Sequence, residues 1–157
     1  MAGKNDLSIR KNIRLTGYDY SNSASYFITI CTQPRRNYFW KNTHAYELSE
    51  IGRIVNQYIQ SIPAHYDLIS VDKYVVMPDH VHLLFTVYYP TLNEDKKSPN
   101  VLHIVKQFKG MVTKAVGKNI WQKSCYDHVI RNDQDYDEVW NYIENNPYKF
   151  LNTLNMQ

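Results

Sequence analysis

The chain has 157 residues, of which 43% are hydrophobic and 21% charged, with 18 Lys and Arg against 15 Asp and Glu. This length fits one domain with its own core, and the composition excludes a wholly disordered chain. No apolar run approaches the roughly 20 residues of a membrane span, and the polar start does not resemble a secretory signal. With only two cysteines, a disulfide scaffold is also excluded. We therefore expect a cytoplasmic protein without membrane contact.

Charge is distributed unevenly along the chain. Residues 1–40 carry six positive and two negative side chains, and residues 101–131 carry six and one. Residues 132–157 carry one positive and five negative side chains. The two basic zones suggest a polyanionic partner, but a net charge of +3 does not identify nucleic acid by itself.

The first half of the chain begins with a basic segment, residues 1–24, which we interpret as an N-terminal arm. Residues 26–32 (YFITICT) are β-branched and aromatic and predict a buried strand. Residues 49–62 predict an amphipathic helix that ends before Pro63. Its expected apolar stripe consists of Ile51, Ile54, Tyr58 and Ile62.

Two further strands are predicted over residues 68–77 and 80–89, joined by a tight hairpin at Pro78 and Asp79. A polar loop, residues 90–100, follows them.

The second half begins with a helix over residues 101–116. Its expected apolar stripe consists of Val101, Val105, Phe108, Val112 and Ala115. Residues 124–131 predict a fourth strand. A last helix is expected to begin at Asn132 or Asp133 and to stop before Pro147.

The order of these elements is typical of the ferredoxin-like βαββαβ fold, an α+β fold with an antiparallel sheet, here followed by an additional helix. We expect one catalytic domain over residues 25–150, with a short tail over residues 151–157. Because this fold hosts many unrelated functions, the function has to be inferred from particular side chains.

The most specific local pattern is His80-Val81-His82 at the start of the third predicted strand. Side chains at i and i+2 of a strand share a face, so both imidazoles project in the same direction. Together with a third ligand they could bind a divalent cation. The alternative is a histidine pair at a strand edge without a ligand role.

Tyr142 and Asn146 share one face of the last predicted helix because they lie four residues apart. A phenol near a cation is a candidate nucleophile, and Asn146 could offer its carbonyl oxygen to the same cation. Alternatively, Tyr142 packs on a neighbouring element and Asn146 caps the helix. The positions of this helix that we expect to face the core are Tyr136, Val139 and Ile143.

Other residues give weaker signals. His128 lies near Asp127 and Arg131 and is a second candidate for the cleft, while Tyr126 is a rival nucleophile on a predicted strand. The chain has no Gly-rich phosphate loop, no Gly-x-Ser-x-Gly motif and no Cys-x-x-Cys pair. These absences argue against a nucleotide-driven enzyme, an acyl hydrolase and a zinc finger.

Several segments in the same order resemble a known family. Residues 78–83 (PDHVHL) resemble the His-hydrophobic-His (HUH) motif of single-tyrosine transposases, and residues 142–147 (YIENNP) resemble their tyrosine motif. Residues 8–20, 26–32 and 121–131 are similar to segments of the same group. Together they resemble the transposases associated with repetitive extragenic palindromes (REP), bacterial relatives of the smallest insertion-sequence enzymes.

The resemblance implies that His80, His82 and Asn146 bind Mg²⁺ or Mn²⁺ and that Tyr142 is the nucleophile. It also implies nicking of DNA near a hairpin through a 5′-phosphotyrosine intermediate, followed by rejoining. Asp79 stands where the family more commonly has asparagine, and we expect this difference to have little effect.

The partner implied by the resemblance is single-stranded DNA with a palindromic hairpin, bound by a monomer or homodimer in the bacterial cytoplasm. Basic side chains of the arm and of the second basic zone would hold the DNA backbone. The candidate DNA-contacting residues are Arg10, Lys11, Arg14, Lys106, Lys109, Lys114, Lys123, His128 and Arg131.

Two other functions remain open at this point. One is a domesticated hairpin-DNA-binding protein without catalytic activity. The other is a metal-dependent nuclease that uses water in place of Tyr142, for which Tyr142→Phe would leave cleavage intact.

Overall fold

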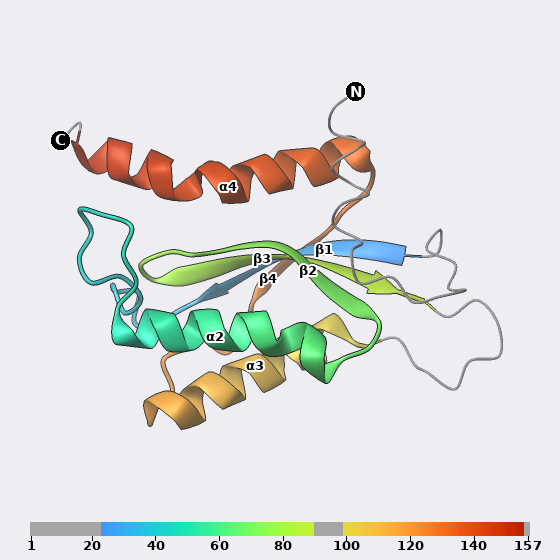
Figure 1. Ribbon diagram of the computed structural model, residues 1–157, viewed down its shortest axis with the longest axis horizontal. Helices are drawn as coiled ribbons and strands as arrows, with labels where there is room; N and C mark the ends of the chain where they lie inside the picture. The colour runs from blue at the N-terminus through green and yellow to red at the C-terminus, as the bar shows by residue number, and fades with distance from the viewer. Residues whose placement is uncertain (1–22, 90–98, 156–157) are drawn as a thin grey trace.

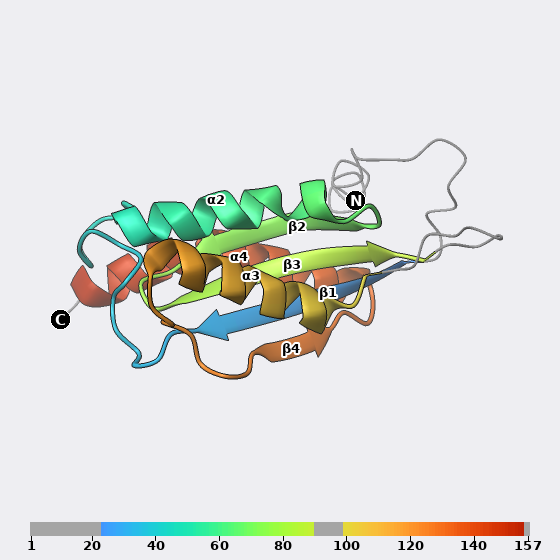
Figure 2. The same ribbon diagram turned by 90° about the horizontal axis from the view of Figure 1, so that it is seen from below.

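A computed structural model describes residues 23–89 and 99–155 of the chain. The elements are β1 (Ser23–Cys31), α2 (Glu50–His65), β2 (Ile69–Val76), β3 (His80–Tyr88), α3 (Val101–Val116), β4 (Tyr126–Val129) and α4 (Asp133–Asn155). The strands form one antiparallel sheet in the order β2-β3-β1-β4, which Figure 2 shows from below. The predicted ferredoxin-like α+β fold with an additional C-terminal helix is confirmed.

The sheet is covered on both faces. Helices α2 and α3 pack side by side against one face, and α4 crosses the other (Figure 1). The central strand β3 is therefore buried along almost its whole length. Because side chains alternate along a strand, Val81, Leu83 and Phe85 face α2 and α3, whereas His80 and His82 face α4. The sheet thus separates the main hydrophobic core from the face that carries the histidines.

Helix α2 begins as predicted, because Ser49 Oγ accepts a hydrogen bond from the Gly52 N–H. The prediction that it ends before Pro63 is wrong, since Pro63 lies inside the last turn. A proline there removes only one helical hydrogen bond, and the buried side chain of Ile62 holds this turn against the core. The buried positions are Gly52, Val55, Ile59 and Ile62, so the predicted stripe was displaced by about one residue.

The predicted hairpin between β2 and β3 is confirmed. The Met77 N–H donates to the His80 carbonyl (2.8 Å), which leaves Pro78 and Asp79 as a two-residue loop. β1 begins at Ser23, inside the range assigned to the arm. β4 is shorter than the predicted strand because the Ser124 carbonyl accepts a hydrogen bond from Lys109 on α3 (3.0 Å) instead of pairing with β1.

Helix α3 has the predicted bounds, with Asn100 as its N-cap and Gly117 in a left-handed conformation (φ 93°) at its end. Ile104 is buried in place of Ala115, which is exposed. Neither this helix nor any other in the described part of the chain combines the length and hydrophobicity that crossing a bilayer requires.

Helix α4 begins as predicted, because Asn132 Oδ1 accepts a hydrogen bond from the Asp135 N–H (2.8 Å). The prediction that it stops before Pro147 is wrong, and the helix continues to Asn155, inside the range assigned to the tail. The extension has its own packing partner, because the Phe150 ring contacts Trp40 edge to face with centroids 5.4 Å apart. The expected core residues Tyr136, Val139 and Ile143 are buried.

Candidate active site

The imidazoles of His80 and His82 converge on one point of the α4 face. Their ring centroids are 4.6 Å apart, and the two Nε2 atoms are separated by 3.1 Å. The Nδ1 atoms point away toward other partners. Asp79 Oδ1 lies 2.7 Å from His80 Nδ1, and Thr29 Oγ1 lies 2.9 Å from His82 Nδ1.

These partners orient both rings. A carboxylate only accepts hydrogen bonds, so His80 Nδ1 carries the proton and Nε2 of the neutral ring has a lone pair. The Thr29 hydroxyl can accept a hydrogen bond from the Nδ1–H of His82, which likewise leaves the Nε2 lone pair of His82 available. Hydrogen bonds of this kind on the far ring nitrogen commonly orient metal-binding histidines. The pair therefore has the donor arrangement that a divalent cation needs.

His82 is 5% exposed. Burial, together with the neighbouring His80 and Arg35, lowers the pKa of His82 to about 3, so this ring is neutral at neutral pH. Burial alone would raise the pKa of Asp79, but the hydrogen bonds from His80 and Arg35 outweigh it and hold that pKa at about 2. The site thus combines the neutral imidazole of His82 with the ionised carboxylate of Asp79, which lies behind the imidazole of His80.

Arg35 was not identified from the sequence. Its guanidinium donates to both carboxylate oxygens of Asp79, at 3.0 and 3.2 Å. Asp79 therefore joins Arg35 to His80. Whether aspartate in place of the commoner asparagine has little effect, as we expected, stays a prediction. The only sequence signal was the Arg35-Arg36 pair after the first strand, and nothing there indicated its partner.

Tyr142 lies on α4 directly above the histidines. Its ring contacts His82 edge to face at 5.3 Å and Phe27 at 5.9 Å, yet the residue is 46% exposed. The structure thus brings the predicted nucleophile and one predicted ligand into contact while leaving the phenol accessible.

Asn146 lies one turn beyond Tyr142 on the same face of α4 and is partly buried. α4 advances about 6 Å over four residues, and β3 covers nearly the same distance over two. Helix α4 runs antiparallel to β3, because Tyr136 lies near Thr86 and Tyr142 lies near His82. The step along α4 from Tyr142 to Asn146 therefore points the same way as the step along β3 from His82 back to His80. Within the described residues, no group of three His, Cys, Asp or Glu side chains could hold a metal.

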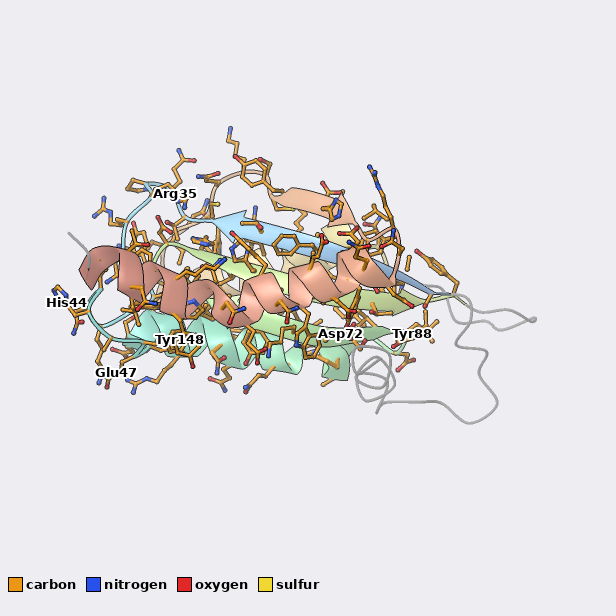
Figure 3. All side chains as sticks on the ribbon, turned by 90° about the horizontal axis from the view of Figure 1, so that it is seen from above. Arg35, His44, Glu47, Asp72, Tyr88 and Tyr148 are labelled. Carbon is orange, nitrogen blue, oxygen red and sulfur yellow. The ribbon has the colours of Figure 1, made fainter. Side chains whose placement is uncertain are left out.

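A polar cluster fixes the N-terminal part of α4. Asp72 lies at a β-bulge in β2 and accepts hydrogen bonds from Tyr136 Oη (2.7 Å), Thr86 Oγ1 (2.5 Å) and Ser70 Oγ (2.5 Å). Figure 3 shows Asp72 toward one end of the sheet and Tyr148 toward the other. The Tyr136 contact fastens α4 to the sheet about nine ångströms along the helix from Tyr142.

The predicted DNA-contacting lysines lie on the opposite face of the sheet. Lys106, Lys109 and Lys123 line a groove of about 520 Å³ between α3 and β4, whereas Lys114 is exposed outside it. Lys109 Nζ donates to the carbonyls of Gln122 (2.8 Å) and Ser124 (3.0 Å). Partial burial lowers its pKa, so Lys109 has a structural role in this groove.

The remaining candidates lie at the β4 edge or outside the described residues. His128 Nε2 lies 2.8 Å from Asp135 Oδ2, which also accepts the Arg131 N–H (3.0 Å). His128 pairs with Phe27 across the strands, so it is next to the ring that contacts Tyr142. Arg10, Lys11 and Arg14 lie outside the described residues.

Comparisons with known proteins bear on the family of this chain. An uncharacterized protein of Haemophilus influenzae is 30% identical over 158 residues, 88% of each chain. A REP-associated tyrosine transposase of Escherichia coli is 39% identical over 81 residues, 51% of this chain and 45% of that protein. A solved REP-associated tyrosine transposase bound to a REP hairpin has a similar fold, with a TM-score of 0.59 and 24% identity over 87% of this chain and 72% of the other.

The family model described as IS200-like transposase matches residues 20–146, a range that includes His80, His82, Tyr142 and Asn146. The family resemblance inferred from the motifs is therefore confirmed, and the chain belongs to the IS200-like transposase family.

Proposed function

We propose that this transposase nicks single-stranded DNA beside a hairpin and rejoins it, with Tyr142 as the nucleophile. The observation that carries the proposal is the contact between the exposed Tyr142 ring and His82, whose Nε2 atom converges with that of His80. A packing tyrosine would be buried, whereas this one is half exposed beside two oriented imidazoles.

The reaction exchanges one phosphodiester for another. Tyr142 Oη attacks the phosphorus, the bond from phosphorus to the 3′-oxygen breaks, and the phenol proton is balanced by protonation of that 3′-oxygen. The products are a 5′-phosphotyrosine and a free 3′-hydroxyl. A second 3′-hydroxyl can attack the phosphotyrosine and release the phenol, so strands are rejoined without a nucleotide cofactor.

His80, His82 and Asn146 would hold the cation, Mg²⁺ or Mn²⁺. When bound, the cation would polarise the scissile phosphate and neutralise its developing charge. The fit rests on the two Nε2 atoms at 3.1 Å and on the hydrogen bonds to the far nitrogens. Because transition-metal ions accept imidazole more readily than Mg²⁺ does, we expect Mn²⁺ to bind more tightly.

The DNA ligand that we propose is a hairpin with single-stranded flanks, by analogy with the solved relative that is bound to a REP hairpin. Lys106 and Lys123 offer positive charge beside the β4 edge, and Tyr126 and His128 lie on the same strand facing α4. A DNA strand that follows this edge would pass from the lysines to Tyr142. Backbone contacts of this kind predict an affinity that falls with added salt.

The test uses single-stranded oligonucleotides copied from both strands of the DNA that flanks the gene. They are incubated with protein and Mn²⁺ or Mg²⁺, with EDTA as a control, and the products are denatured and mapped by mass spectrometry. We expect a covalent adduct on Tyr142 that disappears with EDTA and in Tyr142→Phe. The matched control is Tyr126→Phe, which removes the hydroxyl of the rival tyrosine and should retain the adduct.

The other two functions predict different products. Cleavage without an adduct, unchanged in Tyr142→Phe, would identify a nuclease that uses water. Tight hairpin binding with neither cleavage nor adduct would identify a DNA-binding protein without catalytic activity. Either result would refute the proposed transposase chemistry for this chain.

A further inference from the structure

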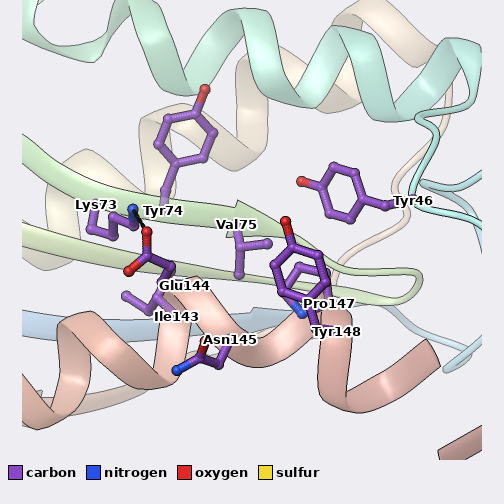
Figure 4. A pocket seen from close by; sticks show the side chains of 9 residues that line it. All are labelled: Tyr46, Lys73, Tyr74, Val75, Ile143, Glu144, Asn145, Pro147 and Tyr148. Atoms are coloured by element: carbon purple, nitrogen blue, oxygen red, sulfur yellow. Dashed lines mark hydrogen bonds and ion pairs between the residues drawn. The ribbon is translucent and has the colours of Figure 1, made fainter. Parts of the chain in front are cut away.

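A second site lies beside α4, between this helix and the outer edge of β2. It is an open cavity of about 640 Å³, within the range of about 300–1,000 Å³ that small-ligand sites occupy. Neither Tyr142 nor Asn146 lines it, so it is separate from the histidine site. The lining residues named below are shown in Figure 4.

One end of the cavity is aromatic. Tyr46, from the segment before α2, and Tyr148, from α4, place their rings beside one another there (Figure 4). Tyr46 is 45% exposed and Tyr148 is 67% exposed, so the core does not use these rings fully. Exposed aromatic rings beside a hollow are the surfaces on which unpaired nucleobases stack.

The wall of the cavity offers backbone hydrogen-bonding groups. β2 is an edge strand in the described sheet, and Tyr74 and Val75 of this strand line the cavity. Because Met77 hydrogen-bonds with His80, the antiparallel alternation leaves Tyr74 in a non-hydrogen-bonded pair with Leu83, so the Tyr74 N–H and carbonyl point away from β3 toward the outer edge. A neighbouring donor and acceptor match the donor and acceptor edges that nucleobases present.

The other end of the cavity is cationic. Lys73 Nζ lies 3.4 Å from Glu144 Oε1 (Figure 4). It also lies 4.8 Å from the centre of the Trp140 ring. Glu144 is 55% exposed, and an ion pair with such a group contributes little to stability, so a phosphate can take the place of Glu144 beside the partly buried Lys73. Aromatic rings at one end and a cation at the other suit a nucleotide, with its base on the tyrosines and its phosphate on Lys73.

The distance to the nucleophile fits a single strand. Tyr148 follows Tyr142 by six residues, which is about 9 Å along the helix axis, or the length of about three stacked nucleotides. We propose that the cavity captures one unpaired base of the single-stranded DNA within a few nucleotides of the scissile phosphate, stacked on Tyr148 and Tyr46. This inference rests on the proposed function, because it takes single-stranded DNA as the ligand.

Photochemical crosslinking tests the base site without requiring cleavage. Hairpin oligonucleotides from the DNA flanking the gene are prepared with 5-iododeoxyuridine at each single-stranded position in turn, bound to protein and irradiated. We expect one position to crosslink to Tyr148 or Tyr46 by mass spectrometry. Tyr148→Ala should weaken binding, measured by fluorescence anisotropy, by roughly 5- to 150-fold, the range of one base–aromatic stack.

Two controls separate stacking from other effects. Tyr148→Phe keeps the ring and should bind within about twofold of the wild type. Tyr126→Ala removes a tyrosine of equal exposure, 68% against 67%, from the β4 edge that the DNA is proposed to follow. Even where this variant lowers the affinity, the bound DNA should still crosslink to Tyr148 from the same oligonucleotide position.

The outcomes distinguish the two proposals. DNA that binds and forms the Tyr142 adduct, but crosslinks only outside the cavity or binds Tyr148→Ala as tightly as wild type, would overturn the base site and leave the transposase chemistry standing. A Tyr148 crosslink without any Tyr142 adduct would support the base site and remove the chemistry. If anisotropy detects no binding of these oligonucleotides, both proposals fail.

Discussion

Gly52 gives the sharpest test of how the loop before His80, formed by Pro78 and Asp79, is held in place. A Cβ at this position of α2 would lie 2.0 Å from the Phe39 carbonyl oxygen and 2.9 Å from its carbon, both closer than the 3.0 Å below which real Cβ contacts essentially never occur. The same carbonyl accepts the Ser49 N–H (2.8 Å). The Phe39 N–H donates to Pro78, in the loop just before His80 (3.1 Å). A displacement of Phe39 therefore reaches the site.

The size of the effect follows from these distances. Gly52→Ala has to move helix or backbone by at least about 1 Å, and overpacking of this kind costs about 1–3 kcal/mol. Weakening the Ser49 hydrogen bond adds about 1 kcal/mol, while the higher helix propensity of alanine returns about 1 kcal/mol. We expect a net loss of about 1–3 kcal/mol in the free energy of unfolding.

Gly110 is the matched control because it lies in the middle of α3, is exposed, and would place an added Cβ in open space, with no neighbouring atom within 4 Å. Gly110→Ala should stabilise the protein by about 0.5–1 kcal/mol through helix propensity alone. Urea unfolding followed by far-ultraviolet circular dichroism measures both variants. If Gly52→Ala is as stable as the wild type, or gains stability as Gly110→Ala does, the close approach of α2 to Phe39 is not the constraint described.

Three further predictions concern the polar contacts around α4 and the histidines. Tyr136→Phe removes one donor from Asp72 and should lower the free energy of unfolding by about 1.5–3 kcal/mol, measured in urea; no change would exclude the cluster as an anchor. Asp79→Asn should weaken Mn²⁺ binding by roughly 10- to 100-fold in calorimetry, as changes behind a ligating histidine do; equal affinity would contradict this and agree with our initial expectation that the difference between aspartate and asparagine at this position has little effect. The hydrogen bond from the Arg131 N–H and the contact with the His128 ring outweigh slight burial and lower the pKa of Asp135 below its ordinary value of 3.8. The ionised carboxylate therefore stabilises the fold above pH 3.8, and this stabilisation is lost as the pH falls through the lowered pKa. The difference in unfolding free energy between wild type and Asp135→Asn should therefore shrink below about pH 4, and a difference that is constant from pH 7 to pH 3 would contradict this account.

Local periodicity was enough to predict the central features of the site. The i, i+2 spacing of His80 and His82 and the i, i+4 spacing of Tyr142 and Asn146 fix a shared face whatever the rest of the fold does. The two-residue loop at Pro78 and Asp79 is equally local. These rules predicted which side chains share a face of one element, but not which elements face each other.

Contacts between distant segments explain what the sequence did not predict. Thr29 orients His82 from 53 residues away, and Arg35 pairs with Asp79 from 44 residues away. Both proline errors have the same origin, because packing of Ile62 and Phe150 carries their helices past Pro63 and Pro147. Tertiary packing overrode the local rule in each case.

In the proposed reaction Tyr142 must be accessible to DNA and also fixed in position, and α4 meets both requirements through its two ends. Tyr136 fastens the helix to Asp72 before Tyr142, and Phe150 packs on Trp40 after it. The tyrosine between these contacts can remain 46% exposed because its position does not depend on its own burial. Tyr148 lies on the same helix, about 120° around its axis from Tyr142, so a base held there would be positioned relative to Tyr142 by one rigid element. Loosening either end should therefore reduce adduct formation more than it reduces DNA affinity.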